Sequence, residues 1–126
     1  MADKKYKILI AEDEKPMAKA LTYKFNNNGF IAKSVFNGQE ALHELKKEEY
    51  DLLILDLMMP VMDGFTLLGE LKNNNINTPV IVASNLGQEN DINEAKKLGA
   101  VDYIIKADTP LLEIIEKVNK VLKKVE

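Results

Sequence analysis

The chain has 126 residues, of which 46% are hydrophobic and 29% are charged, an ordinary composition for a single soluble domain with its own core. It contains no cysteine, which excludes disulfides, zinc–thiolate sites and thiol catalysis. The net charge is −3 with scattered basic residues, so nothing indicates direct nucleic-acid binding. The segment from Met1 to Lys5 is too polar for a signal peptide, and no apolar run could span a bilayer. We therefore expect one cytoplasmic domain over residues 1–126, without membrane insertion.

Strand-like and helix-like segments alternate five times along the chain. Several of the strand-like runs are continuous stretches of branched apolar residues, which is typical of strands that are covered on both faces. The five predicted strands cover residues 7–11, 30–35, 52–56, 80–83 and 102–105.

A helix-like segment follows each predicted strand, and local signals mark the helix ends. Pro16 lies in the first turn of the first helix, and Asn37 and Glu40 form a capping-box-like pair at the second. Thr109 is the predicted cap of the last helix, with Pro110 at its first position. The helices are expected from Pro16 to the Asn-Asn-Asn-Gly stop at 26–29, from Asn37 onward, over 64–73, over 89–98, and from Pro110 onward.

The order of the strands follows from their composition. The alternation of strands and helices implies βα units and a parallel sheet. The first, third and fourth strands each contain a continuous apolar run, at 8–11, 52–55 and 80–83, so they should be central. The second carries Lys33 and the fifth carries Asp102, so these two should be edges. The predicted fold is therefore α/β: a doubly wound, flavodoxin-like parallel sheet of five strands in the order 2-1-3-4-5, with five helices.

Three acidic residues follow two of the central strands. Glu12 and Asp13 come directly after the first strand, and Asp56 ends the third. In such sheets ligands bind at the carboxyl ends of the strands, where the strand order reverses, and that point lies between these two strands. Close carboxylates repel each other unless a cation joins them or one is neutralised, and a cluster without histidine suits Mg²⁺. The alternative interpretation is that Glu12 and Asp13 merely cap the first helix and Asp56 merely ends a strand.

Two further side chains are expected at the same rim. A carboxylate can attack phosphorus, and Asp56, deepest on a central strand, is the best candidate nucleophile. Ser84 and Lys106 fall at the carboxyl ends of the fourth and fifth strands, where a hydroxyl could bind a phosphoryl oxygen and an ammonium could neutralise its charge. Taken singly, they are more often a turn serine and a solvated lysine; together with the acids they indicate phosphoryl chemistry.

At this point the residues match a family. The chain resembles the receiver domain of bacterial two-component response regulators, of the chemotaxis-type, single-domain kind, from about Tyr6 to Val125. The matching motifs are Ala-Glu-Asp-Glu at 11–14, Leu-Asp-Leu-Met-Met-Pro-Val-Met-Asp-Gly at 55–64, Ser84, and Gly-Ala-Val-Asp-Tyr-Ile-Ile-Lys at 99–106.

The resemblance implies a role for each residue. Asp56 corresponds to the phosphoacceptor, which takes a phosphoryl group from the phosphohistidine of a histidine kinase or a histidine phosphotransfer protein. The family's Mg²⁺ site corresponds to Glu12, Asp13 and Asp56 with the backbone carbonyl of Met58. Ser84 corresponds to the family's switch hydroxyl, and Tyr103 corresponds to its switch aromatic. Lys106 corresponds to the lysine that pairs with the aspartate or its phosphate.

The sequence departs from the family's commonest pattern at three positions. Glu12 stands where aspartate is frequent, and Asn85 follows Ser84 where a small residue is usual. The side chain of Asn85 could narrow access to the phosphoryl group or donate a hydrogen bond to it, so the sign of its effect stays open. Ala107 stands where a proline after a cis bond is usual, and since a non-proline cis bond costs about 2.5–4 kcal/mol, we predict a trans 106–107 bond.

The leading hypothesis is a phosphorylation switch that changes the surface formed by the fourth helix, the fifth strand and the fifth helix. A phosphatase of the haloacid-dehalogenase type would need an acid two residues after its nucleophile, where this chain has Met58. The remaining alternative is a receiver-like interaction module that is not phosphorylated. The apolar stripe at 111, 115, 118, 122 and 125 indicates core, yet Ile114 and Val121 widen it, which leaves room for a homodimer or an unknown downstream protein target.

Overall fold

A five-stranded parallel sheet forms the centre of the structure, a computed structural model that describes residues 5–125, with side chains to residue 123. Its strands are β1 (Lys7–Ala11), β2 (Ile31–Val35), β3 (Leu52–Leu55), β4 (Val80–Ser84) and β5 (Asp102–Ile105). They lie in the order β2-β1-β3-β4-β5, which confirms the predicted topology. The switch point therefore falls between β1 and β3, as expected.

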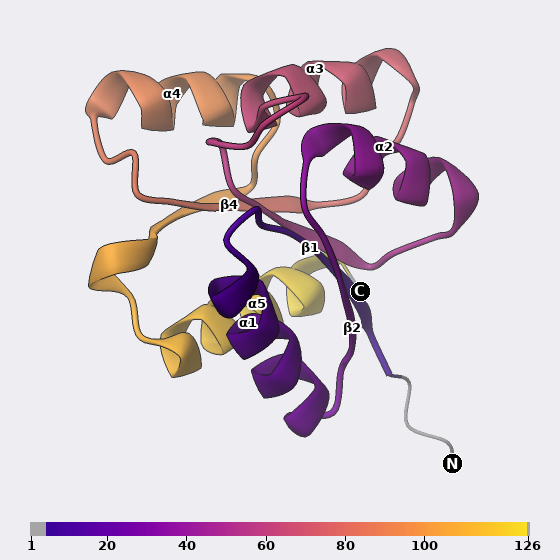
Figure 1. Cartoon of the computed structure of the whole chain (residues 1–126), viewed down its shortest axis with the longest axis vertical. Coiled ribbons are helices and arrows are strands. Elements are labelled where there is room, and N and C mark those ends of the chain that lie inside the picture. Colours follow the sequence, from indigo (N-terminus) through magenta and orange to yellow (C-terminus); the bar gives the residue numbers. More distant parts are fainter. Residues whose placement is uncertain (1–4, 126) are drawn as a thin grey trace.

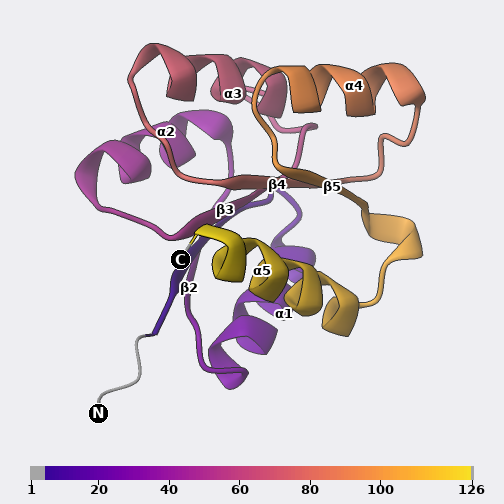
Figure 2. The same ribbon diagram turned by 180° about the vertical axis from the view of Figure 1, so that it is seen from behind.

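Helices cover both faces of this sheet. They are α1 (Lys15–Asn27), α2 (Gly38–Lys47), α3 (Gly64–Asn73), α4 (Glu89–Lys97) and α5 (Leu111–Val125), and a short 3₁₀ turn, η1, spans Lys106–Asp108. Figures 1 and 2 show α2, α3 and α4 on one face and α1 and α5 on the other. This three-layer arrangement confirms the doubly wound α/β fold.

The core consists of two apolar layers, one on each face of the sheet. Side chains of a strand alternate between faces, so Leu9 and Leu53 join the cluster beneath α2 and α3, whereas Ile8 and Ile54 join the cluster beneath α1 and α5. All four are at most 2% exposed. This double-sided burial explains why the central strands are apolar at every position except Lys7, which begins β1, and Ser84, which ends β4.

Most predicted element bounds are right to within one residue, and one predicted cap is wrong. The second strand begins at Ile31 and the third ends at Leu55, so Asp56 is the first residue beyond its strand. The last helix begins at Leu111, and the Pro110 carbonyl accepts its first hydrogen bonds, from the amides of Glu113 and Ile114. Pro110 thus occupies the cap position, while the Thr109 hydroxyl donates to the Ile105 carbonyl at 2.9 Å.

Other local predictions concern the second helix and the two ends of the chain. The Asn37 side chain accepts from the Glu40 amide at 2.8 Å, as the capping-box pattern predicts, and the Glu40 carboxylate accepts in return from the amide of Phe36. The polar segment 1–4 and the side chain of Val125 lie outside the described residues. Within the described part of the chain, no helix is both long and apolar enough to cross a bilayer.

A buried acid, not expected from the sequence, links α2 to the sheet. Glu44 is only 5% exposed, and its carboxylate accepts from the Tyr50 hydroxyl at 2.7 Å and from Lys33 Nζ at 3.1 Å. The hydrogen bond from Tyr50, aided by Lys33, lowers the pKa of Glu44 to about 2. Burial, together with the Glu44 carboxylate, raises the pKa of Tyr50 above its usual value. Glu44 is therefore an anion whose partners exist only in the folded chain.

We expect this acid to make stability depend on pH. Because its folded-state pKa lies below its ordinary value of 4.5, Glu44 contributes stability above pH 4.5 and loses it as the pH falls toward 2. Urea unfolding of Glu44→Gln between pH 5 and pH 2 should therefore show a shallower loss of unfolding free energy than the wild type. Equal slopes in the two proteins would contradict this role for Glu44.

Candidate functional site

The pairing of β1 with β3 brings the acidic residues together. Ala11 lies opposite Leu55 in the parallel register, so the residues that follow them, Glu12 and Asp56, leave the sheet side by side. The Asp56 amide donates to the Ala11 carbonyl, and the Glu12 amide donates to the carbonyl of Val35, each at 3.0 Å. The backbone on both sides of the acids is therefore fixed by the sheet itself.

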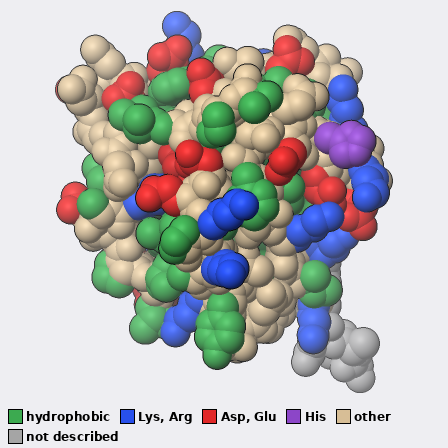
Figure 3. Space-filling model, viewed as in Figure 1, with side chains coloured by type: hydrophobic (Ala, Val, Ile, Leu, Met, Phe, Trp, Pro, Cys, Tyr) green, Lys and Arg blue, Asp and Glu red, His purple; other side chains and the backbone are tan. Residues whose placement is uncertain are grey.

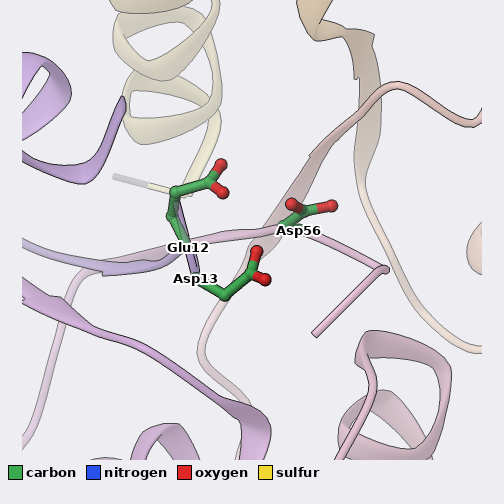
Figure 4. Close-up of side chains that lie close together, drawn as sticks. All are labelled: Glu12, Asp13 and Asp56. Carbon is green, nitrogen blue, oxygen red and sulfur yellow. The ribbon is translucent and has the colours of Figure 1, made fainter. Parts of the chain in front are cut away.

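The three carboxylates converge at this rim. One oxygen each of Glu12, Asp13 and Asp56 lies within 4.8 Å of the other two, and Figure 4 shows the three side chains around one small volume. Glu12 is 2% exposed and Asp56 is 5% exposed, while Asp13 lies nearer the solvent. An all-oxygen donor set of this kind fits a hard divalent cation such as Mg²⁺.

Glu12 shows the electrostatic cost of this arrangement most clearly. Burial raises the pKa of Glu12, and the nearby negative charge of Asp56 acts in the same direction. Hydrogen bonds from Lys106 and from the Glu14 amide, at 3.1 Å, partly offset that rise. The negative charges of Glu12 and Asp56 therefore repel each other, and a bound cation would reduce that repulsion.

Lys106 supplies the positive charge that the cluster has in this structure. Its ammonium donates to Glu12 at 2.6 Å and to Asp56 at 3.0 Å, and its side chain is 5% exposed. Burial opposes the charge, but the two carboxylates outweigh it and raise the pKa of Lys106. None of the described peptide bonds is cis, so the 106–107 bond is trans, as predicted, and Lys106 reaches the acids from that backbone.

The loop after β3 orients the Asp56 carboxylate. The Met58 amide donates to Asp56 Oδ1 at 3.1 Å, while Lys106 binds Oδ2. The end of the loop folds back onto its start: the Gly64 amide donates to the Leu57 carbonyl at 3.0 Å, and Asp63 caps α3 there. Each oxygen of Asp56 therefore has its own donor, which fixes the plane of the carboxylate.

Gly64 is expected to be intolerant of any side chain. A Cβ atom at this position would lie 2.7 Å from both the Asp56 carbonyl oxygen and the Leu57 Cα, which is too close for either backbone atom. Gly64→Ala should lower the free energy of unfolding by about 2 kcal/mol and displace the loop that carries Asp56. Denaturant unfolding, with amide chemical shifts of residues 56–64, measures both effects.

Gly69 provides a matched control for this change. It lies on the same helix, α3, and a Cβ added there would meet nothing within 4 Å. Gly69→Ala should therefore raise the free energy of unfolding by roughly 0.5–1 kcal/mol, because glycine weakens a helix interior. If Gly64→Ala raised the free energy of unfolding as Gly69→Ala does, the close packing of Gly64 against the Asp56 carbonyl would not restrict the loop.

Ser84, the last residue of β4, lies at the same rim. Ser84 is fully buried, pairs with Ile105 in the register of β4 with β5, and accepts from the Leu86 amide at 3.3 Å. The carbonyl of Leu86 in turn accepts a hydrogen bond from the Tyr103 hydroxyl. Burial raises the pKa of this hydroxyl. Ser84 and Tyr103 are thus connected through a single residue of the loop after β4.

Comparison with known proteins identifies the family. The family model described as "Response regulator receiver domain" matches residues 8–119. The chain belongs to the response regulator receiver domains. The regulatory protein VanRc of Enterococcus gallinarum is 34% identical over 118 residues, which are 94% of this chain and 50% of that protein. The transcriptional activator IrlR of Burkholderia pseudomallei is 36% identical over 94% of this chain and 51% of its own length.

Solved structures agree with this family. The receiver domain of the Francisella response regulator 1452 superimposes with a TM-score of 0.91 at 38% identity, covering 96% of this chain and 99% of that one. This receiver domain spans about half the length of the curated relatives it matches, and these include regulators of transcription. The narrower expectation of a chemotaxis-type, single-domain regulator stays a prediction.

The structure brings together most of the residues that the sequence singled out. Glu12, Asp13, Asp56 and Lys106 form one cluster, and Ser84 lies on the strand beside the one that leads to Lys106. Figure 3 shows acidic side chains exposed near the middle of one face, with lysines next to them. The structure also shows a direct hydrogen bond between Asn85 and Ala107 that the sequence does not predict, although both residues depart from the common pattern.

Proposed function

We propose that this receiver domain accepts a phosphoryl group on Asp56. The observation that carries the proposal is the geometry of Asp56: it lies within 4.8 Å of two other acids and 3.0 Å from the buried ammonium of Lys106. A surface acid that only ended a strand would need neither. The membership of the chain in the receiver family supports the same role.

In the proposed reaction, a carboxylate oxygen of Asp56 attacks the phosphorus of a phosphohistidine. The new O–P bond forms as the P–N bond breaks, and the imidazole of the donor leaves with the bonding electron pair. Lys106 stays beside the carboxylate and balances negative charge that gathers on the phosphoryl oxygens. The donor is a histidine kinase or a histidine phosphotransfer protein.

The metal ligands proposed for Mg²⁺ are Glu12, Asp13 and Asp56, with the backbone carbonyl of Met58. When bound, the ion would offset the repulsion among the acids and bind phosphoryl oxygens as a Lewis acid. Asp13, the most exposed of the three acids, lies where an ion arriving from the solvent meets the cluster first.

The proposed switch runs from Ser84 to Tyr103. A phosphoryl group on Asp56 would draw the Ser84 hydroxyl toward it, and Ser84 is linked through Leu86 to the hydroxyl of Tyr103. Tyr103 lies on β5, so its movement would change the surface formed by α4, β5 and α5. That surface is the proposed binding site for a downstream protein or for a second copy of the chain, in the cytoplasm.

The experiment that tests this proposal is a reaction with acetyl phosphate. Intact-mass measurement should show one added phosphoryl group per chain in Mg²⁺, and the adduct should vanish when EDTA removes the ion. No adduct with Mg²⁺ would contradict the proposal and favour an interaction module that is not phosphorylated. Equal adduct in EDTA would contradict the role of the metal ligands.

A further inference from the structure

Two loops meet directly beside Lys106. Asn85 follows β4, Ala107 follows β5 by two residues, and Asn85 Oδ1 accepts a hydrogen bond from the Ala107 amide at 3.0 Å. Ser84 and Ile105 are the last paired residues of these strands, so the bond extends their pairing past the end of the sheet. Beyond the last backbone pair, the Asn85 side chain supplies the hydrogen bond between the two segments.

The hydrogen bond links two site residues, Ser84 and Lys106, through the residue that follows each of them. Asn85 is bonded covalently to Ser84, and Ala107 to Lys106, whose ammonium reaches Glu12 and Asp56. On the other side of the same loop, the Leu86 carbonyl accepts from Tyr103. The segment 84–86 is therefore attached to β5 through Tyr103 and to the turn after β5 through Ala107, and Asn85 makes the attachment nearest to Lys106.

The bond depends on both departures from the common receiver pattern. A small apolar side chain at position 85 would have no acceptor, and a proline at position 107 would have no amide hydrogen to donate. The hydrogen bond therefore needs both departures together: the acceptor of Asn85 and the amide hydrogen of Ala107. The orientation of the Asn85 side chain follows, since its oxygen and not its nitrogen must face the Ala107 amide.

From this geometry we infer that Asn85 is a positioning residue: its hydrogen bond to Ala107 holds the backbone of Lys106 so that the ammonium stays on Asp56. The inference rests on the proposed function. It predicts whether Asn85 assists or hinders phosphoryl acceptance at Asp56, which the sequence left open. Asn85 should favour phosphoryl acceptance through Lys106, because its oxygen is engaged with Ala107. A residue that mainly narrowed access to Asp56 would act in the opposite direction.

A double-mutant cycle tests the inference with acetyl phosphate and Mg²⁺. One change is Asn85→Ala, and the other replaces the 106–107 amide by an ester, with lactic acid in place of Ala107, which deletes the donor hydrogen and keeps the methyl group. Each single change should slow adduct formation about three- to tenfold, the range that one hydrogen bond commands. Together they should slow it no more than either alone, because both remove the same bond.

Two results would overturn the inference. A faster reaction of Asn85→Ala would make Asn85 an obstacle, and a double variant slowed by the product of the single effects would show that the two groups act separately. Asn77→Ala is the matched control: Asn77 is exposed in the loop before β4, at the opposite end of the sheet, and should leave the rate unchanged.

Nuclear magnetic resonance separates this inference from the proposed function. Without any phosphodonor, the Ala107 amide should exchange with solvent about three- to tenfold faster in Asn85→Ala than in the wild type, and the Lys106 ammonium resonance should broaden. Equal exchange would overturn the inference even if Asp56 is phosphorylated. If the wild type forms no adduct while these signals change as expected, the proposed function fails and the positioning of Lys106 by Asn85 stands.

Discussion

Asp56→Asn should abolish the adduct that acetyl phosphate forms with the wild-type chain in Mg²⁺. An amide oxygen is a poor nucleophile toward phosphorus, and the neutral side chain also removes one of the three charges that hold a cation. The shape of the side chain is kept, and its oxygen can still accept a hydrogen bond from Lys106 or from the Met58 amide. Intact-mass measurement should show the added phosphoryl group on the wild type alone.

Asp63→Asn is the matched control for this variant. Asp63 lies on the same loop, is exposed, and caps α3 by accepting from the Thr66 amide at 2.8 Å. Asparagine caps helices about as well as aspartate, so the same chemical change at this position should leave both stability and adduct formation intact. An adduct on Asp56→Asn equal to that on the wild type would place the chemistry at another residue.

Lys106→Met should lower the free energy of unfolding by about 3 kcal/mol in the absence of Mg²⁺. Methionine preserves much of the packing of the lysine stem but leaves Glu12 and Asp56 buried without the ammonium that now lies 2.6 Å and 3.0 Å from them. Breaking a buried ion pair from one side is costly, because the remaining charge keeps its desolvation penalty. Denaturant unfolding measures the loss.

Magnesium provides the internal check on this variant. The ion should stabilise Lys106→Met more than the wild type, because it supplies positive charge that the variant lacks. Lys117→Met is the control: its partner Asp102 lies 3.7 Å away and both side chains are 34% exposed, so the loss should stay below about 1 kcal/mol. A loss at Lys106 no larger than at Lys117 would contradict the buried role of Lys106.

The fold could be predicted because its strongest signals are local. The apolar runs that became β1, β3 and β4 are buried on both faces, and such runs have few structural alternatives. Once the strand order is known, parallel pairing forces Glu12 and Asp56 to the same rim. The acid cluster could therefore be predicted from the strand order and the parallel pairing alone.

The parts that could not be predicted depend on how loops approach each other. Nothing in the sequence indicates that Leu86 offers its carbonyl to Tyr103, or that the oxygen of Asn85 reaches the Ala107 amide, since both contacts are set by loop backbone. The burial of Glu44 is not among the predictions, although Glu44 lies three residues after Ala41, on the apolar side of α2. That spacing was the one available signal for a buried acid.

The most direct test is a crystal structure of the chain with Mg²⁺ and beryllofluoride. We expect the beryllium on a carboxylate oxygen of Asp56, with fluorines contacting Ser84 and Lys106. The ion should lie among Glu12, Asp13, Asp56 and the Met58 carbonyl, bound to them directly or through water. An ion bound elsewhere, or an Asp56 left free at saturating beryllofluoride, would contradict the account.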